Sequence, residues 1–314
     1  MDTICFSRFC FTISPKQALH LPPYKGSAFR GGFGHAFKRV VCINRNKDCK
    51  DCILKSKCVY AYIFETEPPK DAAIKRKYAS APHPFVLCPP LDTKTRFTSK
   101  EPLCFDLTLI GKAVGFLPYF IYTFDELGNM GIGKGRGKYN LDRVTQVNGQ
   151  GQTAEIYNAS QKTLTSPSPP LTGDVFQKNT SSVSQTKLIF HTPLRIKEKG
   201  DLVVDLTFPL FMERLLQRIT VLSYFHCNGP GQADHESLLK QAENVNVKEK
   251  SLRWHDWERY SKRQDARMKL GGLLGTVTFE GDLGEFLPYL KVGEYVHVGQ
   301  GTSFGLGGYE VVID

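Results

Sequence analysis

Two stretches of this 314-residue chain repeat one another at a constant distance of 170 residues. The segments FDLTLIGKAVGFLPYF (105–120) and GTVTFEGDLGEFLPYL (275–290) share the sequence FLPY, a glycine five residues before it, and apolar residues at alternate positions ahead of that glycine. A glycine-rich loop follows each copy, beginning at Gly131 and at Gly299. Three features in the same order indicate that one structural unit occurs twice.

Each copy extends upstream into an expected strand and an expected helix. In the first half, residues 4–13 alternate in part between apolar and polar types, and residues 27–41 place Phe29, Phe33 and Phe37 on one helical face. The second half repeats this order with a strand over 187–196 and a helix over 208–225. The order strand, helix, strand, strand, helix, strand predicts an α+β protein of tandem ferredoxin-like (βαββαβ) domains.

The domain boundaries follow from the repeat and from composition. We predict an N-terminal domain over 1–148 with a cysteine-rich insertion at 42–58, and a C-terminal domain over 185–314 with a glycine-rich loop at 299–308. Residues 149–184 are rich in Ser, Thr, Gln and Pro, which predicts a linker or a mobile insertion.

The excess of positive charge predicts a polyanionic partner. The formal net charge is +10, and the basic residues cluster between residues 25 and 57, in the first glycine-rich loop and in 253–269. Neither glycine-rich loop carries the G-K-[ST] sequence of a nucleotide-binding P-loop, so a nucleotide cofactor is disfavoured. The N-terminus lacks a signal-like apolar core, and Lys112 and Pro118 interrupt the most apolar stretch, so we expect a cytoplasmic protein without a membrane partner.

Backbone N–H groups of glycine turns and nearby cations are suited to phosphates. Spacing by four of Arg259, Arg263 and Arg267 predicts one basic face of a helix. Another face of that helix would carry Trp254, Trp257 and Tyr260, which would stack on bases or pack in the core. The residues expected to contact the phosphates of a nucleic acid are Arg30, Arg39, Lys134, Arg136, Lys138, Arg259, Arg263, Arg267, Gly299, Gly301, Gly305 and Gly307.

Four of the nine cysteines lie within seventeen residues. Cys42, Cys49, Cys52 and Cys58 follow the spacing C-x6-C-x2-C-x5-C, and lysines surround them. A C-x2-C step can turn two thiolates toward one ion, so we expect a structural zinc site, with an iron–sulfur cluster as the alternative metal group and scattered reduced thiols as the alternative without metal.

Three sequences in the chain resemble one protein family. The C-terminal GQGTSFGLGGY (299–309) is similar to the glycine-rich loop of the RAMP superfamily of CRISPR-associated proteins. The sequences LPPYKGSAFRGGFGHAFKRVVC (21–42) and WHDWERYSKRQDARMKLGGLLG (254–275) resemble its pre-crRNA-processing endoribonucleases. The resemblance implies metal-independent cleavage of CRISPR repeat RNA, in which a 2′-OH attacks the adjacent phosphate and leaves a 2′,3′-cyclic phosphate and a 5′-OH. It also implies CRISPR repeat RNA and crRNA as partners, and a CRISPR effector complex as a further one.

His35 is the first candidate for the catalytic group. An imidazole titrates near neutral pH, and on a helix His35 shares a face with Lys38 three residues later. The resemblance implies a Tyr, a His and a Lys in this region, which match Tyr24, His35 and Lys38. His255 and His297 rank second and third.

Two other functions remain open from the sequence. One is a non-catalytic crRNA-binding subunit of the same superfamily, and the other is a metal–thiolate protein whose glycine loops bind a small anion.

Overall fold

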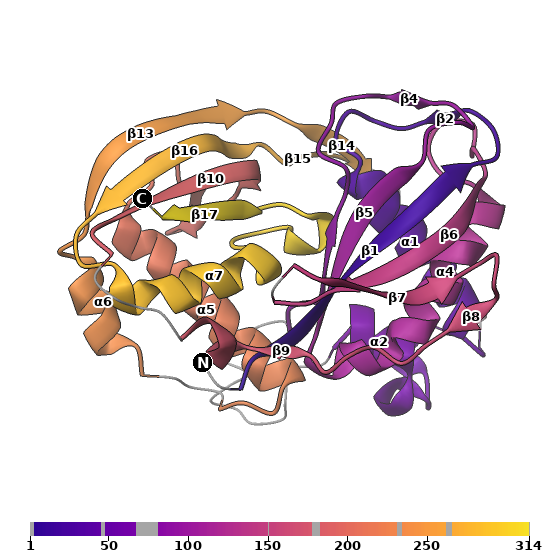
Figure 1. Cartoon of the computed structure of the whole chain (residues 1–314), viewed down its shortest axis with the longest axis horizontal. Helices are drawn as coiled ribbons and strands as arrows, with labels where there is room; N and C mark the ends of the chain where they lie inside the picture. The colour runs from indigo at the N-terminus through magenta and orange to yellow at the C-terminus, as the bar shows by residue number, and fades with distance from the viewer. Residues whose placement is uncertain are drawn as a thin grey trace. The chain divides into compact units, whose positions relative to one another are not determined.

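Two units, each with its own main antiparallel sheet, make up this mixed α+β chain in the computed structural model (Figure 1). Residues 5–171 and 225–228 form the N-terminal unit, and residues 172–224 and 229–314, with a short segment ending at Ile4, form the C-terminal unit. The structure describes residues 3–44, 48–66, 81–149, 151–177, 183–230, 234–261 and 266–313.

The N-terminal unit has a main sheet in the order β3-β5-β1-β6-β7-β8, with neighbouring strands antiparallel. A separate two-stranded sheet pairs β2 with β4. The elements are β1 Cys5–Pro15, β2 Leu19–His20, α1 Gly26–Val41, the 3-10 turns η1 Cys49–Asp51 and η2 Lys55–Lys57, α2 Val59–Phe64, β3 Phe85–Cys88, β4 Arg96–Phe97, β5 Leu103–Ile110, the 3-10 turn η3 Gly111–Phe116, α4 Leu117–Met130, β6 Tyr139–Val147, β7 Thr153–Asn158 and β8 Thr163–Leu164.

An aromatic cluster fixes α1 and α4 on this sheet. Phe29, Phe33 and Phe37 are fully buried, as the helical spacing predicted. The ring centres of Phe29 and Phe105 are 4.8 Å apart, and those of Phe33 and Phe124 are 4.9 Å apart. Each buried Phe contributes roughly 1.5–3 kcal/mol through removal of apolar area from water, so one face of α1 is committed to the core and the other is left outside.

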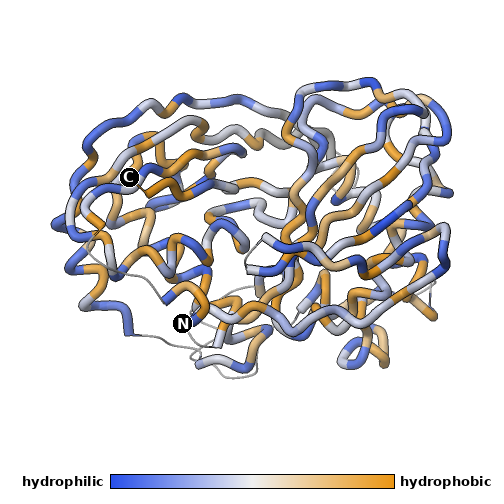
Figure 2. Tube along the Cα trace, viewed as in Figure 1, coloured by the Kyte–Doolittle hydropathy of each residue, from blue (hydrophilic) through white to orange (hydrophobic). Residues whose placement is uncertain are grey.

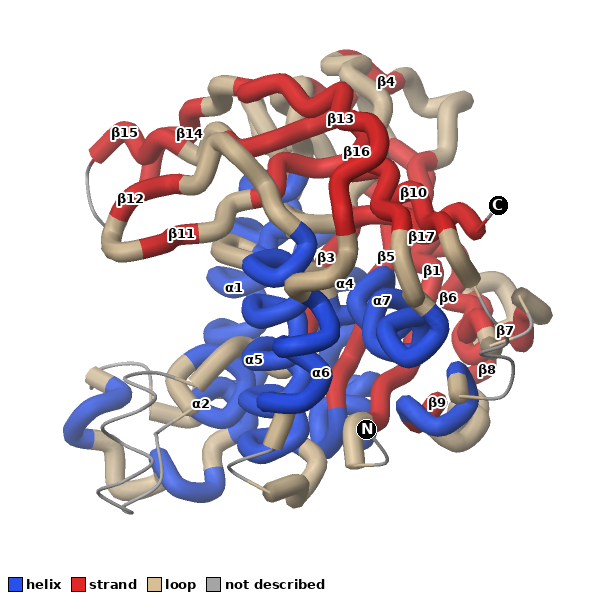
Figure 3. The backbone as a smooth tube through the Cα atoms, turned by 90° about the vertical axis from the view of Figure 1, so that its left-hand side faces the viewer, coloured by secondary structure: helices blue, strands red, loops and turns tan. Residues whose placement is uncertain are grey.

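The C-terminal unit has the sheet order β13-β16-β10-β17, with α5 and α7 on one side of it (Figure 3). Phe208 of α5 lies 4.9 Å from the ring centre of Phe279, and Phe211 lies 5.3 Å from that of Tyr309. The elements are β9 Leu171–Thr172, the 3-10 turn η4 Gly173–Phe176, β10 Gln185–Leu194, β11 Lys197–Glu198, β12 Asp201–Leu202, α5 Phe208–His226, α6 Glu236–Ala242, β13 Asn246–His255, β14 Glu258–Ser261, β15 Ala266–Lys269, β16 Gly272–Glu280, the 3-10 turn η5 Gly284–Phe286, α7 Leu287–Val296, the 3-10 turn η6 Thr302–Phe304 and β17 Tyr309–Ile313.

The repeat at 170 residues is confirmed in the backbone. Helix α4 begins at Leu117 and α7 begins at Leu287, each directly after the phenylalanine of FLPY. The same offset joins two buried tyrosines that open the last strand of each copy. The hydroxyl of Tyr139 donates to the carbonyl of Phe124 at 2.7 Å, and that of Tyr309 donates to the carbonyl of Leu290 at 2.7 Å.

Part of the expected linker is folded into the N-terminal unit. Within 149–184, β7 pairs with β6, β8 pairs with β7, and Ile156 is only 3% exposed. With a single buried Ile among Ser, Thr and Glu, this segment lacks the alternation of apolar and polar residues that marks a strand. Its composition therefore predicted a linker, although the segment adds β7 and β8 to the sheet. Residues 150 and 178–182 lie outside the described residues.

The prediction of a helix after Trp254 is wrong. The segment forms the end of β13 and the antiparallel hairpin β14–β15, in which Arg259 pairs with Met268 and Tyr260 pairs with Arg267. The predicted stripe of three arginines on a helix therefore does not exist, and Arg263 lies outside the described residues. Strand β13 is an edge strand with almost every residue exposed, and its trace is mostly hydrophilic in Figure 2. Burial thus imposes no period on it, and the spacing of aromatic residues by three misled the prediction.

The most apolar stretch of the sequence is divided between β5, η3 and α4. In the described ranges, no helix is long and apolar enough to cross a membrane.

Candidate functional site

The outer face of α1 presents Gly31, His35 and Arg39, one turn apart and all exposed. It lies opposite the phenylalanines that pack in the core. The side chain of His35 makes no hydrogen bond or ion pair with any residue in the described ranges. A Cβ atom added at Gly31 would have no heavy atom within 4 Å, so the surface one turn before His35 is open. The imidazole of His35 is therefore accessible to a ligand.

The other two residues of the expected catalytic set have different surroundings. The ammonium of Lys38 lies 5.5 Å from the ring centre of Tyr60, a cation–π contact that holds it toward α2. Tyr24 is half-buried just before α1, and burial, with a smaller effect of the Cys88 thiol, raises its pKa well above 10. Tyr24 is therefore protonated at neutral pH and could serve as a hydrogen-bond donor. Its catalytic role, like that of Lys38, stays a prediction.

Arg30 and Arg39 differ although both lie on α1. The guanidinium of Arg30 lies 4.6 Å from the ring centre of Phe64, and its Nη2 is 3.1 Å from Nε2 of His83. Arg30 thus packs among aromatic rings, while Arg39 is exposed beside His35. Arg39 is the better placed of the two for a phosphate.

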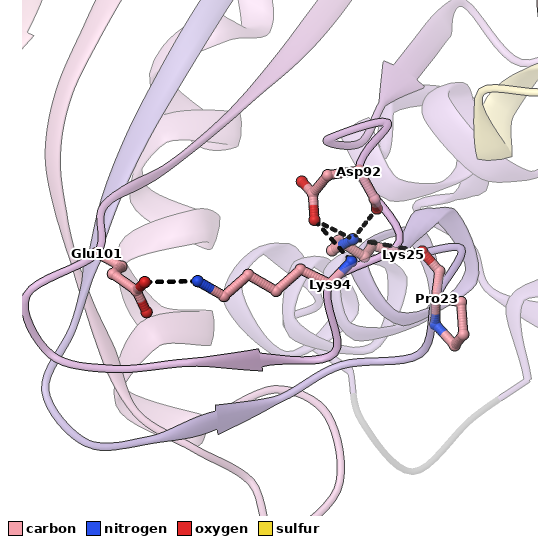
Figure 4. A network of polar contacts seen from close by, with 5 residues as sticks. All are labelled: Pro23, Lys25, Asp92, Lys94 and Glu101. Atoms are coloured by element: carbon pink, nitrogen blue, oxygen red, sulfur yellow. Dashed lines mark hydrogen bonds and ion pairs between the residues drawn. The ribbon is translucent and has the colours of Figure 1, made fainter.

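A buried lysine anchors the start of α1. The side chain of Lys25 is fully buried, and its Nζ donates to the carbonyl of Pro23 at 3.3 Å, to Oδ1 of Asp92 at 3.2 Å and to the carbonyl of Asp92 (Figure 4). Three acceptors satisfy the three N–H bonds of the ammonium, which a buried charge requires. The network ties the turn before α1 to the loop that leads into β4.

An ion pair closes the other side of that loop. Lys94 donates to Glu101 (Figure 4). Glu101 also accepts from the backbone N–H and the hydroxyl of Thr98. These contacts, that of Lys94 foremost, lower the pKa of Glu101 to about 2. The loop between Asp92 and Glu101 is therefore held at both ends.

The first glycine-rich loop, residues 131–137, has an open and charged tip. A bridge between Ile132 and Gly137 closes its base, and the tip presents Lys134, Gly135 and Arg136 to solvent. Lys138 is exposed directly after the loop. These three cations were expected to bind RNA, and the structure leaves them accessible.

The second glycine-rich loop, residues 299–308, is built into the core of its unit. Its backbone is bound to the end of β10: the N–H of Gln300 donates to the carbonyl of Arg195 at 2.8 Å, and that of Gly307 donates to the carbonyl of Pro193 at 3.0 Å. Thr302 and Ser303 are buried. Positive φ angles occur at the four glycines expected to bind RNA, Gly299, Gly301, Gly305 and Gly307.

Of the other histidines, His297 and His226 are buried and hydrogen-bonded, whereas His255 is exposed. His297 is 5% exposed, with Nδ1 3.1 Å from the carbonyl of Leu306, so it supports the second loop. His226 is fully buried, with Nε2 2.8 Å from the carbonyl of Pro82 and Nδ1 3.1 Å from the hydroxyl of Tyr62. His255 is exposed on β13.

The structure brings together two residues that sequence reasoning missed. His20 of β2 pairs with Arg96 of β4 on one side and forms a bridge to Lys134 on the other. All three are exposed. Because 76 residues separate His20 from Arg96, only a prediction of the pairing between two short strands could have found this row.

The four thiols of the cysteine-rich insertion lie at the ends of short elements. Cys42 follows α1, Cys49 begins η1, Cys52 follows η1, and Cys58 joins η2 to α2. All four are half-buried and free. In the described part of the chain, no three Cys, His, Asp or Glu side chains are gathered closely enough to hold a metal ion.

Comparison with protein families gives two matches along the chain. A family model for an N-terminal domain matches residues 4–169, more than half of the chain. A model described as CRISPR-associated endoribonuclease Cas6 matches residues 188–309. An uncharacterized protein of Archaeoglobus fulgidus is 25% identical over 306 residues, which cover 93% of each chain.

Solved structures share the fold. A partial Cas6-RT-Cas1–Cas2 complex is similar with a TM-score of 0.61 and 14% identity over 99% of this chain, which spans 46% of the matched chain. The Cas6 of Thermus thermophilus is similar with a TM-score of 0.57 and 16% identity, over 98% of this chain and 99% of that one. The overall architecture is therefore Cas6-like.

Proposed function

The chain belongs to the family of the CRISPR-associated endoribonuclease Cas6, and we propose that it cleaves CRISPR repeat RNA in pre-crRNA to produce mature crRNA. The observation that carries the proposal is His35, an exposed imidazole without an intramolecular partner in the described ranges, on a helix that also exposes Arg39. Similar chains include Cas6 proteins solved as product complexes, which supports a cleavage reaction.

The proposed reaction is a transesterification without a metal ion. The 2′-oxygen of one nucleotide forms a bond to the adjacent phosphorus, and the bond from phosphorus to the 5′-oxygen breaks. His35 takes the proton of the 2′-hydroxyl or gives one to the departing 5′-oxygen, and Lys38 with Arg39 stabilises the charge that develops on the phosphate. Tyr24 donates a hydrogen bond. The products are a 2′,3′-cyclic phosphate and a 5′-OH.

The wider RNA surface is proposed to include the charged tip of the first glycine-rich loop, Arg30 and the hairpin that contains Arg259 and Arg267. Of the four glycines of the second loop, Gly299 and Gly301 are partly exposed and Gly305 and Gly307 are buried, so a backbone contact to RNA is proposed at Gly299 and Gly301 only. We further infer that both units are ferredoxin-like domains, because each has the element order βαββαβ and the strand order 2-3-1-4 within its four shared strands.

The test is incubation of the purified protein with the repeat RNA of its own genome in EDTA, followed by mapping of both RNA ends. His35→Ala is expected to slow cleavage by about 10²–10⁴-fold, since removal of a general acid–base group typically costs that much. Binding of the RNA is expected to be retained. His191→Ala is the matched control, because this exposed histidine lies in the C-terminal unit and contacts Glu310.

Unchanged cleavage by His35→Ala would contradict the assignment of the site. Tight binding with no cyclic-phosphate product from any repeat RNA would instead indicate the alternative, a non-catalytic crRNA-binding subunit. Association with CRISPR proteins, as in the Cas6-RT-Cas1–Cas2 complex, is a further proposal that co-purification tests.

We also propose that the cysteine-rich insertion binds a structural zinc ion. Neither 3-10 turn contains a buried residue, and Ile43 and Ile53 are 88% and 92% exposed, so little apolar burial stabilises the segment. Helices α1 and α2 pack together, with Cys42 directly after α1 and Cys58 directly before α2. Zinc would draw the side chains together and supply the missing stabilisation. Metal analysis of the purified protein should give one zinc per chain, lost in Cys52→Ser, and visible absorbance would indicate an iron–sulfur cluster instead.

A further inference from the structure

The strand β2 lies between two segments that are far apart in the sequence. On one side Leu19 and His20 pair with Phe97 and Arg96 of β4. On the other side the N–H of Lys134 donates to the carbonyl of His20 at 2.9 Å. The two-stranded sheet of β2 and β4 is thus joined to the first glycine-rich loop by one isolated antiparallel bridge.

Alternation along β2 and β4 turns the charged side chains outward. Leu19 is 0% exposed and Phe97 is 6% exposed, so this pair faces the core. The next pair, His20 and Arg96, points to the opposite face, and both are exposed. Lys134 lies opposite His20 and is exposed as well. The result is a row of three side chains, Arg96, His20 and Lys134, separated by roughly one strand spacing of ~4.8 Å.

This basic row carries an unbalanced positive charge. None of its three members takes part in an ion pair within the described ranges. The nearby carboxylates are occupied, because Asp92 pairs with Lys25 and Glu101 pairs with Lys94. Cations placed in one cross-strand row destabilise a sheet, so an external anion would relieve the repulsion.

The support beneath the basic row is rigid. The buried Lys25 network and the Lys94–Glu101 pair hold the loop that carries β4 (Figure 4). The N–H of Leu21 donates to the carbonyl of Thr95 at 2.9 Å, which extends the pairing of β2 and β4. Side chains on a fixed backbone at fixed spacing lose little freedom when they bind a ligand.

We propose that Arg96, His20 and Lys134 form a subsite for the phosphodiester backbone of RNA, which Arg136 and Lys138 extend. The subsite rests on the proposed function, because it would hold the substrate away from the reacting phosphate at His35. Contacts of cations to phosphates position an RNA but carry no sequence information. The subsite should therefore add affinity equally for repeat RNA and for unrelated RNA.

The test measures binding of 2′-O-methylated repeat RNA, which lacks the attacking hydroxyl and cannot be cleaved. The triple variant Arg96→Gln, His20→Gln, Lys134→Gln is expected to bind about tenfold more weakly, with a slope of log K against log salt that is lower by about 1–2. An unrelated RNA of equal length should lose affinity to the same extent. Lys162→Gln, an exposed cation elsewhere in the N-terminal unit, is the control.

Unchanged affinity and an unchanged salt slope in the triple variant, with its unfolding temperature maintained, would overturn the subsite. A loss confined to the repeat sequence would also overturn it, since that result indicates base recognition. Lys134→Arg should retain wild-type affinity. Since the assay needs no cleavage, weaker binding supports the subsite even if the protein proves to be a non-catalytic subunit, and normal binding with active cleavage removes the subsite alone.

Discussion

The two glycine-rich loops occupy equivalent places in the repeat but have different surroundings. Gly131, Gly135 and Gly137 of the first loop lie 170 residues before Gly301, Gly305 and Gly307 of the second. The first loop ends in an exposed basic tip, whereas Thr302 and Ser303 of the second loop are buried. The same backbone motif thus supports an accessible surface in one unit and core packing in the other.

The segments that hold the two loops differ in the same way. The first loop is bonded to His20, whose side chain is exposed. The second is bonded to Arg195, which is 8% exposed and donates to the carbonyl of Gly271. Burial lowers the pKa of this guanidinium, as desolvation of a cation requires. The difference indicates that a glycine-rich sequence by itself is weak support for ligand binding. Whether such a loop can bind a ligand depends on the exposure of its tip.

The largest expected effect is the different loss of unfolding free energy when a glycine of each glycine-rich loop is replaced by alanine. A Cβ at Gly307, where φ is +69°, would meet the carbonyl oxygen of Val298, whereas a Cβ at Gly135, where φ is +80°, would have no atom within 4 Å. Gly307→Ala should cost about 3 kcal/mol or more of the free energy of unfolding, and Gly135→Ala about 1–2 kcal/mol from the backbone conformation alone. Denaturant unfolding measures both, and equal losses would break the comparison.

A smaller effect tests what the two units have in common. Tyr139→Phe and Tyr309→Phe each remove one hydroxyl that donates to a buried carbonyl, so each should cost about 1–2 kcal/mol. Tyr122→Phe is the control, because Tyr122 is 55% exposed and its loss should change little. A substantial cost for one of the buried tyrosines alone would mean that the two copies are not equivalent at this position.

The smallest effect is an opposite dependence on pH. The folded pKa of Glu101, about 2, lies below its ordinary value of 4.5, so its stabilisation is present above about pH 4.5 and is lost as the pH falls toward 2. Burial raises the pKa of Glu294 above 4.5, so its contribution is present below pH 4.5 and is lost as the pH rises through the raised value.

Unfolding of Glu101→Gln and Glu294→Gln between pH 3 and pH 7 measures these contributions. Relative to the wild type, Glu101→Gln should become less stable as the pH rises, and Glu294→Gln should become more stable. Slopes of the same sign would contradict the opposite environments of the two carboxyl groups.

The parts of the fold that the sequence predicted are those in which burial imposes a period. Phe29, Phe33 and Phe37 mark α1 because one face of the helix must be apolar, and the helix begins within one residue of the expected position. The repeat worked for the same reason, since both copies of FLPY start a helix that packs on a sheet.

The predictions from the sequence failed where few residues are buried, because the apolar residues there show no regular spacing. Strand β13 is exposed along its length, so Trp254 and Trp257 suggested a helix that does not form. The candidate site shows the same limit. His35 could be chosen from its residue type and helical position, but the row that includes His20 and Arg96 depends on pairing between two-residue strands.

The open tip at Gly135 has a consequence for how the two copies can diverge. Substitutions in the second loop disturb contacts with Val298, Arg195 and Pro193, so selection for folding restricts them. The tip of the first loop lies beyond the bridge between Ile132 and Gly137 and makes few contacts. Its sequence can therefore change to suit the ligand without loss of the fold. Among related proteins with the same duplication, we expect the sequence of the buried loop to be similar. The sequence of the exposed loop should differ with the CRISPR repeat RNA that each protein binds.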